Sequence, residues 1–414
     1  MCFKKRTDVT TEYEILFMKI KNKLSYLIAF AALNQALSFL PMIPQAFYYL
    51  IMALGFIFVL AKKPVKVNFL VFLFIIAAIT SLLVNDVPPL FSANERLLIF
   101  VLISSVAGPL LNSPNIFLFR NQIFCVINRI LILLSALSFV TYLLGIAFPW
   151  SGTGASSGFF NHSLMLGPLA AVSLLILVYI KIDFMKLRMD IKYKKYINLL
   201  ILLVFLALLV SSSRSSILGF GAGLLFLIYK INQNKFGKLI SAIFKIVLIM
   251  LISSPIWFSY TEGIRQKMEY SDSQGGLASS RNAHWDARLY EFNSSPLFGI
   301  GFATADIKSP LAIGINEQTG GLEPGSSWIA ILAMTGVFGF VVIVLLFVYL
   351  FVFLWRDKNN LSKSGILGAL LLFFGLHMGA EGYFLAAGSF LFFYIWLLLG
   401  VILGYKQYAV LKVI

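Results

Sequence analysis

The sequence has few of the residues on which many protein functions depend. Cysteine occurs only twice, at Cys2 and Cys125, which excludes a disulfide framework. Histidine occurs three times, at scattered positions without cysteine nearby, so no zinc-binding spacing is present. Charged residues make up 12% of the chain, compared with about 25% in an average soluble domain. These shortages argue against a secreted disulfide-rich domain and against an ordinary soluble enzyme.

Apolar residues are abundant instead, at 60% of the chain. They form runs of about 20 residues, the length that crosses a bilayer as a helix. A soluble protein of 414 residues could not bury this much apolar surface. We therefore expect an all-α polytopic membrane protein with about twelve transmembrane helices. The predicted spans are 24–40, 45–61, 67–84, 97–112, 130–148, 163–180, 196–211, 215–230, 239–259, 326–355, 364–384 and 387–404.

The net charge of +16 lies in short basic clusters between the apolar runs. Such clusters mark cytoplasmic loops and predict no nucleic-acid partner. We expect a cytoplasmic tail at 1–23, a single membrane domain at 24–404 and a cytoplasmic tail at 405–414, in a bacterial inner membrane. With this topology only seven of the 33 Lys and Arg residues face outward. They are Arg96, Arg214, Arg265, Lys267, Arg281, Arg288 and Lys308.

One polar loop, 260–325, is much longer than the others and faces outward between the ninth and tenth spans. A long loop on a compact helical protein is usually functional. If Ser280–Arg288 is helical, Arg281, Trp285 and Arg288 share one face, with His284 beside them. That face would suit a phosphorylated sugar or a membrane surface, and spacing alone favours neither.

Arg214 lies between the seventh and eighth spans, in a run of five serines that includes Ser213 and Ser215. A cation beside hydrocarbon needs an anion or a watery cavity, and hydroxyls at a helix start suit a phosphate. The alternative is an arginine that reaches lipid headgroups. The next glycines, Gly219–Gly223, predict close helix packing and no nucleotide site.

Other polar residues near the membrane are weaker candidates. Glu323 is a possible general base if it lies near an arginine, and otherwise a surface charge. His377 and Glu381 would share one helix face, one turn apart. This pair suits either a transporter's proton relay or a structural polar contact. His162 starts the sixth span.

These motifs, in this order, resemble the O-antigen ligase and O-antigen polymerase superfamily of membrane enzymes. The similarity covers roughly 150–400. The matching stretches are Gly158–His162 with Gly167, Ser213–Ser216, Arg281–Trp285 with the flexible return Pro296–Phe302, and Ser326–Trp328 through Gly336 and Gly339. The ligases carry a histidine where Gly325 stands here, so the resemblance favours a polymerase.

The resemblance implies a glycosyl transfer at the periplasmic face, without cofactor or metal. The donor and acceptor would be glycans on undecaprenyl diphosphate, with membrane lipid and a chain-length regulator as further partners. Arg214 and Arg281 would stabilise the leaving diphosphate, with Arg288 as a weaker third cation, and Trp285 would stack on a sugar ring. Glu323 and His284 are the implied bases, and His162, Ser213, Ser215, His377 and Glu381 are further predicted substrate-binding residues.

Two rival functions remain open on sequence. The first is an O-antigen ligase that transfers glycan to lipid A core or protein, against which Gly325 argues. The second is a polysaccharide transporter or flippase, which suits the many spans and the His377–Glu381 pair. Against a transporter, the two halves of the chain show no repeat.

Overall fold

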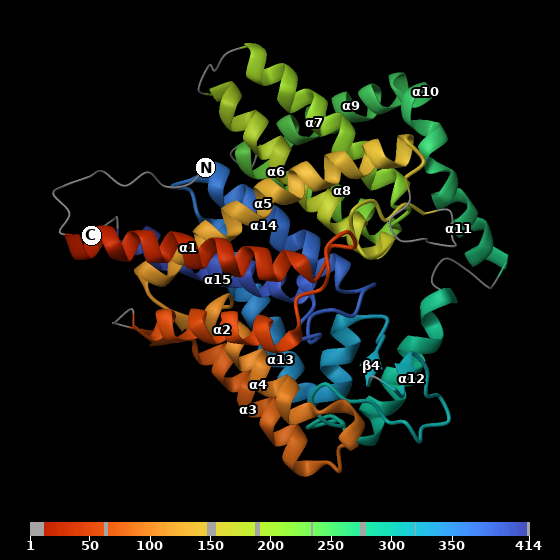
Figure 1. Ribbon diagram of the computed structural model, residues 1–414. Helices are drawn as coiled ribbons and strands as arrows, with labels where there is room; N and C mark the ends of the chain where they lie inside the picture. The colour runs from red at the N-terminus through yellow and green to blue at the C-terminus, as the bar shows by residue number, and fades with distance from the viewer. Residues whose placement is uncertain are drawn as a thin grey trace.

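The structure is a computed structural model that describes residues 12–61, 65–146, 155–186, 191–232, 235–273, 279–318 and 320–411. These residues are mostly α-helical, which confirms the predicted all-α class (Figure 1). Two small antiparallel pairs also occur in the described ranges. Strand β1 (Lys66–Val67) pairs with β2 (Leu111–Asn112), and β3 (Ile315–Asn316) pairs with β4 (Gly321–Leu322).

Each predicted span corresponds, in order, to one helix of the described residues. Within the described ranges, six helices are long and apolar enough to cross a membrane, and a seventh is possible if α9 and the bent segment after it are taken together. The figure of about twelve crossings therefore stays a prediction. The helices are α1 (Glu12–Asn34), α2 (Gln45–Leu60), α3 (Phe69–Val84), α4 (Ala93–Val106), α5 (Pro114–Leu143), α6 (Ser163–Lys186), α7 (Ile191–Val210), α8 (Arg214–Ile231), α9 (Phe236–Ile252), α13 (Ser327–Arg356), α14 (Leu361–His377) and α15 (Phe390–Leu411).

Helix α5 begins well before the span predicted at 130–148. Its first half carries Arg120, in a stretch predicted to lie between two spans. The Arg120 guanidinium is buried, and it donates hydrogen bonds to the carbonyls of Ser105 at 2.7 Å and Val106 at 2.9 Å and to Asn112 Oδ1 at 3.0 Å. Because these acceptors satisfy the guanidinium, the helix continues through it.

The polar loop predicted at 260–325 is itself partly helical. After α10 (Ser254–Trp257) and the 3-10 turn η2 (Phe258–Thr261) come α11 (Glu262–Ser273) and α12 (Ser279–Ser294). The β3–β4 pair follows. Figure 1 shows α11, α12 and the β4 strand together at one end of the membrane helices. The loop therefore forms a small cap on that end.

The return of the loop, Pro296–Phe302, was predicted to be flexible, but hydrogen bonds hold it against α13. Ile300 N–H donates to the Ala333 carbonyl at 2.9 Å, and Val337 N–H donates to the Pro296 carbonyl at 2.9 Å. These bonds form where α13 is interrupted at Gly336, which has φ 65°. A break in a helix frees backbone groups, and here the returning chain binds them.

Helices α8 and α14 pack closely through the glycine face predicted from Gly219 and Gly223. A Cβ atom at Gly219 would lie 2.8 Å from the Phe373 ring, and one at Gly223 would lie 2.9 Å from the Ala369 carbonyl oxygen. Only glycine allows this approach. The packing places the start of α8 against the end of α14, where the candidate site forms.

Candidate functional site

Arg214 is the first residue of α8, as its position after the serine run predicted. One guanidinium nitrogen, Nη2, donates to Ser271 Oγ of α11 at 3.2 Å. The other, Nη1, is buried and has no hydrogen-bond partner among the described residues. A buried guanidinium nitrogen without an acceptor is costly, so it suits an anionic ligand.

Lys267 approaches the same place from α11, one turn before Ser271. Its Nζ donates to the carbonyl oxygen of Ser212, two residues before Arg214, at 3.4 Å. Burial lowers the pKa of the Lys267 ammonium, and the nearby positive charges of Arg214 and Arg281 lower it further, while Glu381 raises it. From the sequence, Lys267 was predicted only to be an outward-facing basic residue. The signal available in the sequence for its role was its spacing of one helical turn from Ser271 in a polar helix.

Arg281 lies at the start of α12 and binds the chain that follows α14. Its Nη2 forms an ion pair with Glu381 Oε1 at 2.5 Å, and its Nη1 donates to the Gly325 carbonyl at 3.2 Å. Trp285 Nε1 donates to the same carbonyl at 3.2 Å. Burial raises the pKa of the Glu381 carboxyl, and Arg281 opposes that rise. The predicted proximity of Arg281 and Trp285 on one face of α12 is confirmed.

Arg214, Lys267 and Arg281, together with Glu381, are called the cation cluster below. They come from α8, α11, α12 and the segment after α14. The charges of the three other members all shift the pKa of Lys267. Three cations face one carboxylate, so the cluster has an excess of positive charge. Such an excess in a partly buried place favours binding of a multiply charged anion such as a diphosphate.

His377 and Glu381 do not share a helix face, so that prediction is wrong. Helix α14 ends at His377, and Ser327 ties down the chain beyond it: Ser327 N–H donates to the Met378 carbonyl at 2.8 Å, and Ser327 Oγ donates to the Glu381 carbonyl at 2.6 Å. The prediction rested on a helical span that continued to residue 384. The two side chains consequently have different partners.

His377 is buried in a short chain of polar side chains. Its Nε2 lies 3.2 Å from Ser216 Oγ, and its Nδ1 lies 3.1 Å from the Tyr383 hydroxyl. Ser216 in turn lies 2.7 Å from Ser213 Oγ. The chain links α8 to α14 directly behind Arg214. His377 and Ser213 thus hold the start of α8 in place.

The remaining predicted residues lie around this centre. Glu323 is exposed, and its charge raises the pKa of Glu381, so it lies near the cluster. His284 packs against Gly314 and Gly325. His162 is exposed at the start of α6, where its Nδ1 accepts from Leu164 N–H at 3.1 Å. Ser215 is half-buried on the first turn of α8.

Arg288 is not brought to the cation cluster. It forms an ion pair with Glu291 at 2.7 Å, and both side chains are only 1% exposed. Glu291 Oε1 also accepts from Asp306 N–H at 2.8 Å. Burial lowers the pKa of Arg288 and raises the pKa of Glu291 to about 7. The pair joins α12 to the loop after it.

Removing one partner of this pair should destabilise the loop more than removing both. Arg288→Met leaves the Glu291 carboxylate buried alone, which costs about 3–5 kcal/mol, whereas Arg288→Met with Glu291→Leu replaces the pair by apolar groups at little cost. Thermal unfolding of the purified protein measures both. If the double variant folds normally yet loses donor binding, Arg288 contacts the substrate as first predicted.

Gly325 has a conformation and surroundings that exclude a side chain. Its φ is +70°, and a Cβ atom would lie 2.8 Å from His284 Cβ and 3.4 Å from the Trp285 ring. Its carbonyl accepts from both Arg281 and Trp285. The position at which the resemblance implies a histidine in ligases is therefore used here to hold α12.

Gly325→Ala should lower the stability of the protein. The left-handed backbone costs an L-residue about 1–2 kcal/mol, and the contact with His284 adds to that cost. Gly221→Ala on α8 is the matched control, because a Cβ there meets nothing within 4 Å. Denaturation in detergent measures the difference. Equal stability of the two variants would contradict the described geometry.

Comparison with known proteins identifies one region of the chain. Residues 199–344 match the family model described as O-Antigen ligase. A search of curated proteins finds no match. The matched region runs from α7 through the large loop into α13, so it contains Arg214, Lys267 and Arg281, whereas Glu381 lies beyond it.

The match agrees with the apolar helices of the fold and with the motifs. The family indicates glycan transfer of the O-antigen ligase and polymerase type, by membrane glycosyltransferase-like enzymes acting on lipid-linked glycans. The apolar helices indicate a multi-pass membrane protein. The resemblance predicted from the sequence is confirmed: residues 199–344 of this membrane protein are similar to the O-Antigen ligase family.

Proposed function

We propose that this protein polymerises lipid-linked oligosaccharide repeat units at the periplasmic face of the inner membrane. The donor is a glycan on undecaprenyl diphosphate, and the acceptor is the terminal sugar of a second lipid-linked repeat. The observation that carries the proposal is the cation cluster, in which a buried Arg214 nitrogen has no hydrogen-bond partner within the described part of the chain. The product would be O-antigen, capsule or exopolysaccharide.

In the proposed reaction, the acceptor hydroxyl oxygen bonds to the anomeric carbon of the donor. The bond from that carbon to the diphosphate oxygen breaks, and its electron pair leaves with the diphosphate. Preorganised cations stabilise the charge that develops there. Arg214 and Lys267 are suited to contact the diphosphate, because neither forms an ion pair among the described residues. Arg281 completes the field while it holds Glu381.

The proton of the acceptor hydroxyl must pass to a base. Glu323 is favoured, since its side chain is exposed and lies near the cluster. Glu381 is less suited because Arg281 occupies its carboxylate. His284 is the second candidate base. Trp285 uses its indole N–H on Gly325, which leaves only its ring face for a sugar.

Gly325 supports a polymerase over a ligase. The histidine that the resemblance assigns to ligases has no room at this position. The ligase remains the second candidate because the matched family model itself is described as O-Antigen ligase. A transporter is disfavoured. His377 and Glu381 do not share a helix face, so the proton relay that suggested a transporter is not formed by this pair.

Complementation of a strain that lacks this protein tests the proposal. Wild type and Arg214→Ala are compared. Arg265→Ala is the control, because Arg265 is an exposed residue of α11 whose guanidinium lies over the ring of Phe258. We expect Arg214→Ala to leave single repeat units on the carrier at the periplasmic face. Long lipid-linked polymer that fails only to attach would instead identify a ligase, and repeats trapped on the cytoplasmic leaflet would identify a transporter.

A further inference from the structure

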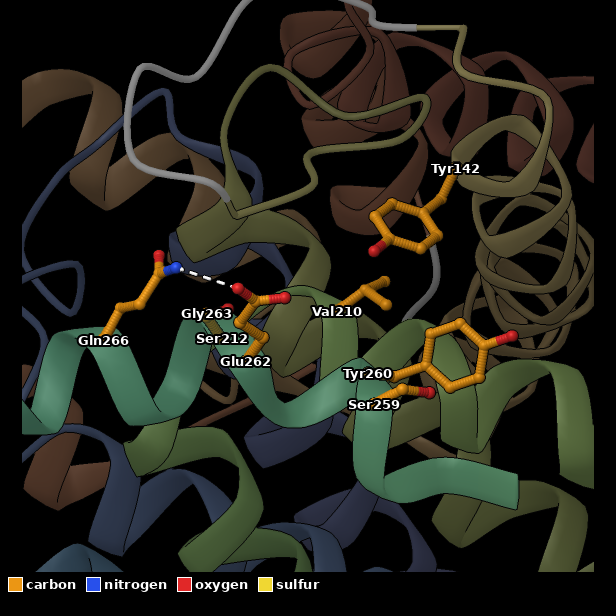
Figure 2. Close-up of a pocket in the computed structure, with 8 residues that line it drawn as sticks. All are labelled: Tyr142, Val210, Ser212, Ser259, Tyr260, Glu262, Gly263 and Gln266. Carbon is orange, nitrogen blue, oxygen red and sulfur yellow. Dashed lines mark hydrogen bonds between the residues drawn. The ribbon is translucent and has the colours of Figure 1, made fainter. Parts of the chain in front are cut away.

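A cavity of about 260 Å³ lies beside the cation cluster. It forms where the ends of α5 and α7 meet η2 and the first turn of α11, and Ser212 lies in its wall (Figure 2). Pockets for drug-sized ligands have about 300–1,000 Å³. This cavity is therefore the size for a smaller group, about one sugar ring.

The wall of the cavity carries aromatic rings on one side and polar groups on the other. Figure 2 shows Tyr142 and Tyr260 on one side, and Glu262 with Gln266 on the opposite side. The two tyrosine rings lie edge to face with centroids 6.2 Å apart. Gln266 Nε2 donates to Glu262 Oε1 at 3.2 Å, and the exposed Glu262 carboxylate can accept further hydrogen bonds.

This combination of groups suits a saccharide. An aromatic face packs on the apolar C–H face of a sugar ring, while carboxylate, amide and hydroxyl groups bind its hydroxyls. Among the described residues that line the wall, Glu262 is the one ionisable acid or base apart from the tyrosines. Its negative charge disfavours phosphate headgroups and acidic sugars. The occupant is therefore a neutral or amino sugar.

The cavity and the cation cluster share a wall. The Ser212 carbonyl that accepts from Lys267 Nζ belongs to a residue that lines the cavity. On α11, Gly263 lines the cavity, and Lys267 follows it by one helical turn, a rise of about 6 Å. A sugar in the cavity would thus lie next to a diphosphate held by Arg214 and Lys267.

We propose that this cavity is a saccharide subsite, which binds one neutral or amino sugar ring of the lipid-linked glycan next to the diphosphate. The inference rests on the proposed function and deepens it. The tyrosines bind the face of the ring, and Glu262 with Gln266 binds its hydroxyls. The subsite would help to select which repeat units are joined.

Binding measurements on the purified full-length protein in nanodiscs test this subsite. The probes are repeat-unit oligosaccharides released by mild acid from the lipid-linked pool of the native cells, and undecaprenyl diphosphate without sugar. Tyr260→Ala and Glu262→Gln are compared with Tyr290→Ala and Glu269→Gln, which change exposed residues of α12 and α11 outside the cavity. Oligosaccharide binding is followed by saturation-transfer NMR.

We expect the cavity variants to weaken oligosaccharide binding at least about tenfold, a loss of about 1.4 kcal/mol, and to leave diphosphate binding unchanged. Arg214→Ala should do the reverse. Unchanged oligosaccharide binding in both cavity variants, with normal diphosphate binding, overturns the subsite alone. If wild type binds no undecaprenyl diphosphate, the proposed function fails instead. Loss of co-purifying phospholipid without loss of oligosaccharide binding would identify a headgroup pocket and also overturn the subsite.

Discussion

Replacing Arg214 with alanine is expected to lower the rate of glycan transfer about 100- to 1,000-fold, the effect of removing one preorganised donor from a developing negative charge. Its Nη1 is buried without a partner in the described residues, so it is available to the diphosphate. Arg214→Lys should recover only part of the rate, because an ammonium cannot bind Ser271 and a phosphate in the same geometry. The measurement is the initial rate with purified lipid-linked repeats.

The control for Arg214→Ala is Arg265→Ala, which removes an exposed arginine of α11. Thermal unfolding of both variants separates a catalytic loss from misfolding. A folded Arg214→Ala protein that transfers glycan within about tenfold of the wild-type rate would contradict the role of Arg214 in stabilising the leaving group.

Lys267→Met is expected to reduce transfer about 10- to 100-fold, which corresponds to about 1.4–2.7 kcal/mol of transition-state stabilisation. The ammonium lies beside Ser212 and within the field of Arg214 and Arg281. Lys308→Met is the control, since Lys308 is exposed in the same loop. Equal rates for the two variants would exclude a role of Lys267 in the transfer reaction.

The same residue should set the alkaline limit of activity. Burial and the charge of Arg214 lower the pKa of Lys267 below its ordinary value of 10.5. As pH rises through this lowered pKa, the ammonium loses its charge, and transfer should fall before an ordinary lysine would titrate. Lys267→Arg keeps its charge and should move the limit to higher pH. An unchanged limit in Lys267→Arg would assign the titration to another group.

Much of the helical layout could be predicted from the sequence, because each apolar run long enough to span a bilayer forms a helix. The glycine face of α8 was also predictable, since Gly219 and Gly223 are spaced one turn apart. Arg214 was found because an outward arginine beside a span is unusual. These signals are local, so the sequence contains them directly.

The partners of the cluster could not be predicted, because they depend on contacts between distant segments. Glu381 meets Arg281 from 100 positions away, and Arg214 meets Ser271 from 57 positions away. The end of α14 was predicted too late in the sequence for the same reason. Ser327 of α13 donates hydrogen bonds to the carbonyls of Met378 and Glu381, and these bonds hold the chain in a non-helical path after His377. Arg288 looked like Arg281 in sequence, and only its burial with Glu291 distinguishes the two.

The most direct test of polymerase activity is a reaction of the purified protein with a single lipid-linked repeat unit as both donor and acceptor. A polymerase yields carrier-linked oligomers of two and more repeats, and releases one undecaprenyl diphosphate for each bond formed. Mass spectrometry resolves both products. If no oligomer forms, and added lipid A core or protein receives the glycan instead, the protein is a ligase and the polymerase proposal is contradicted.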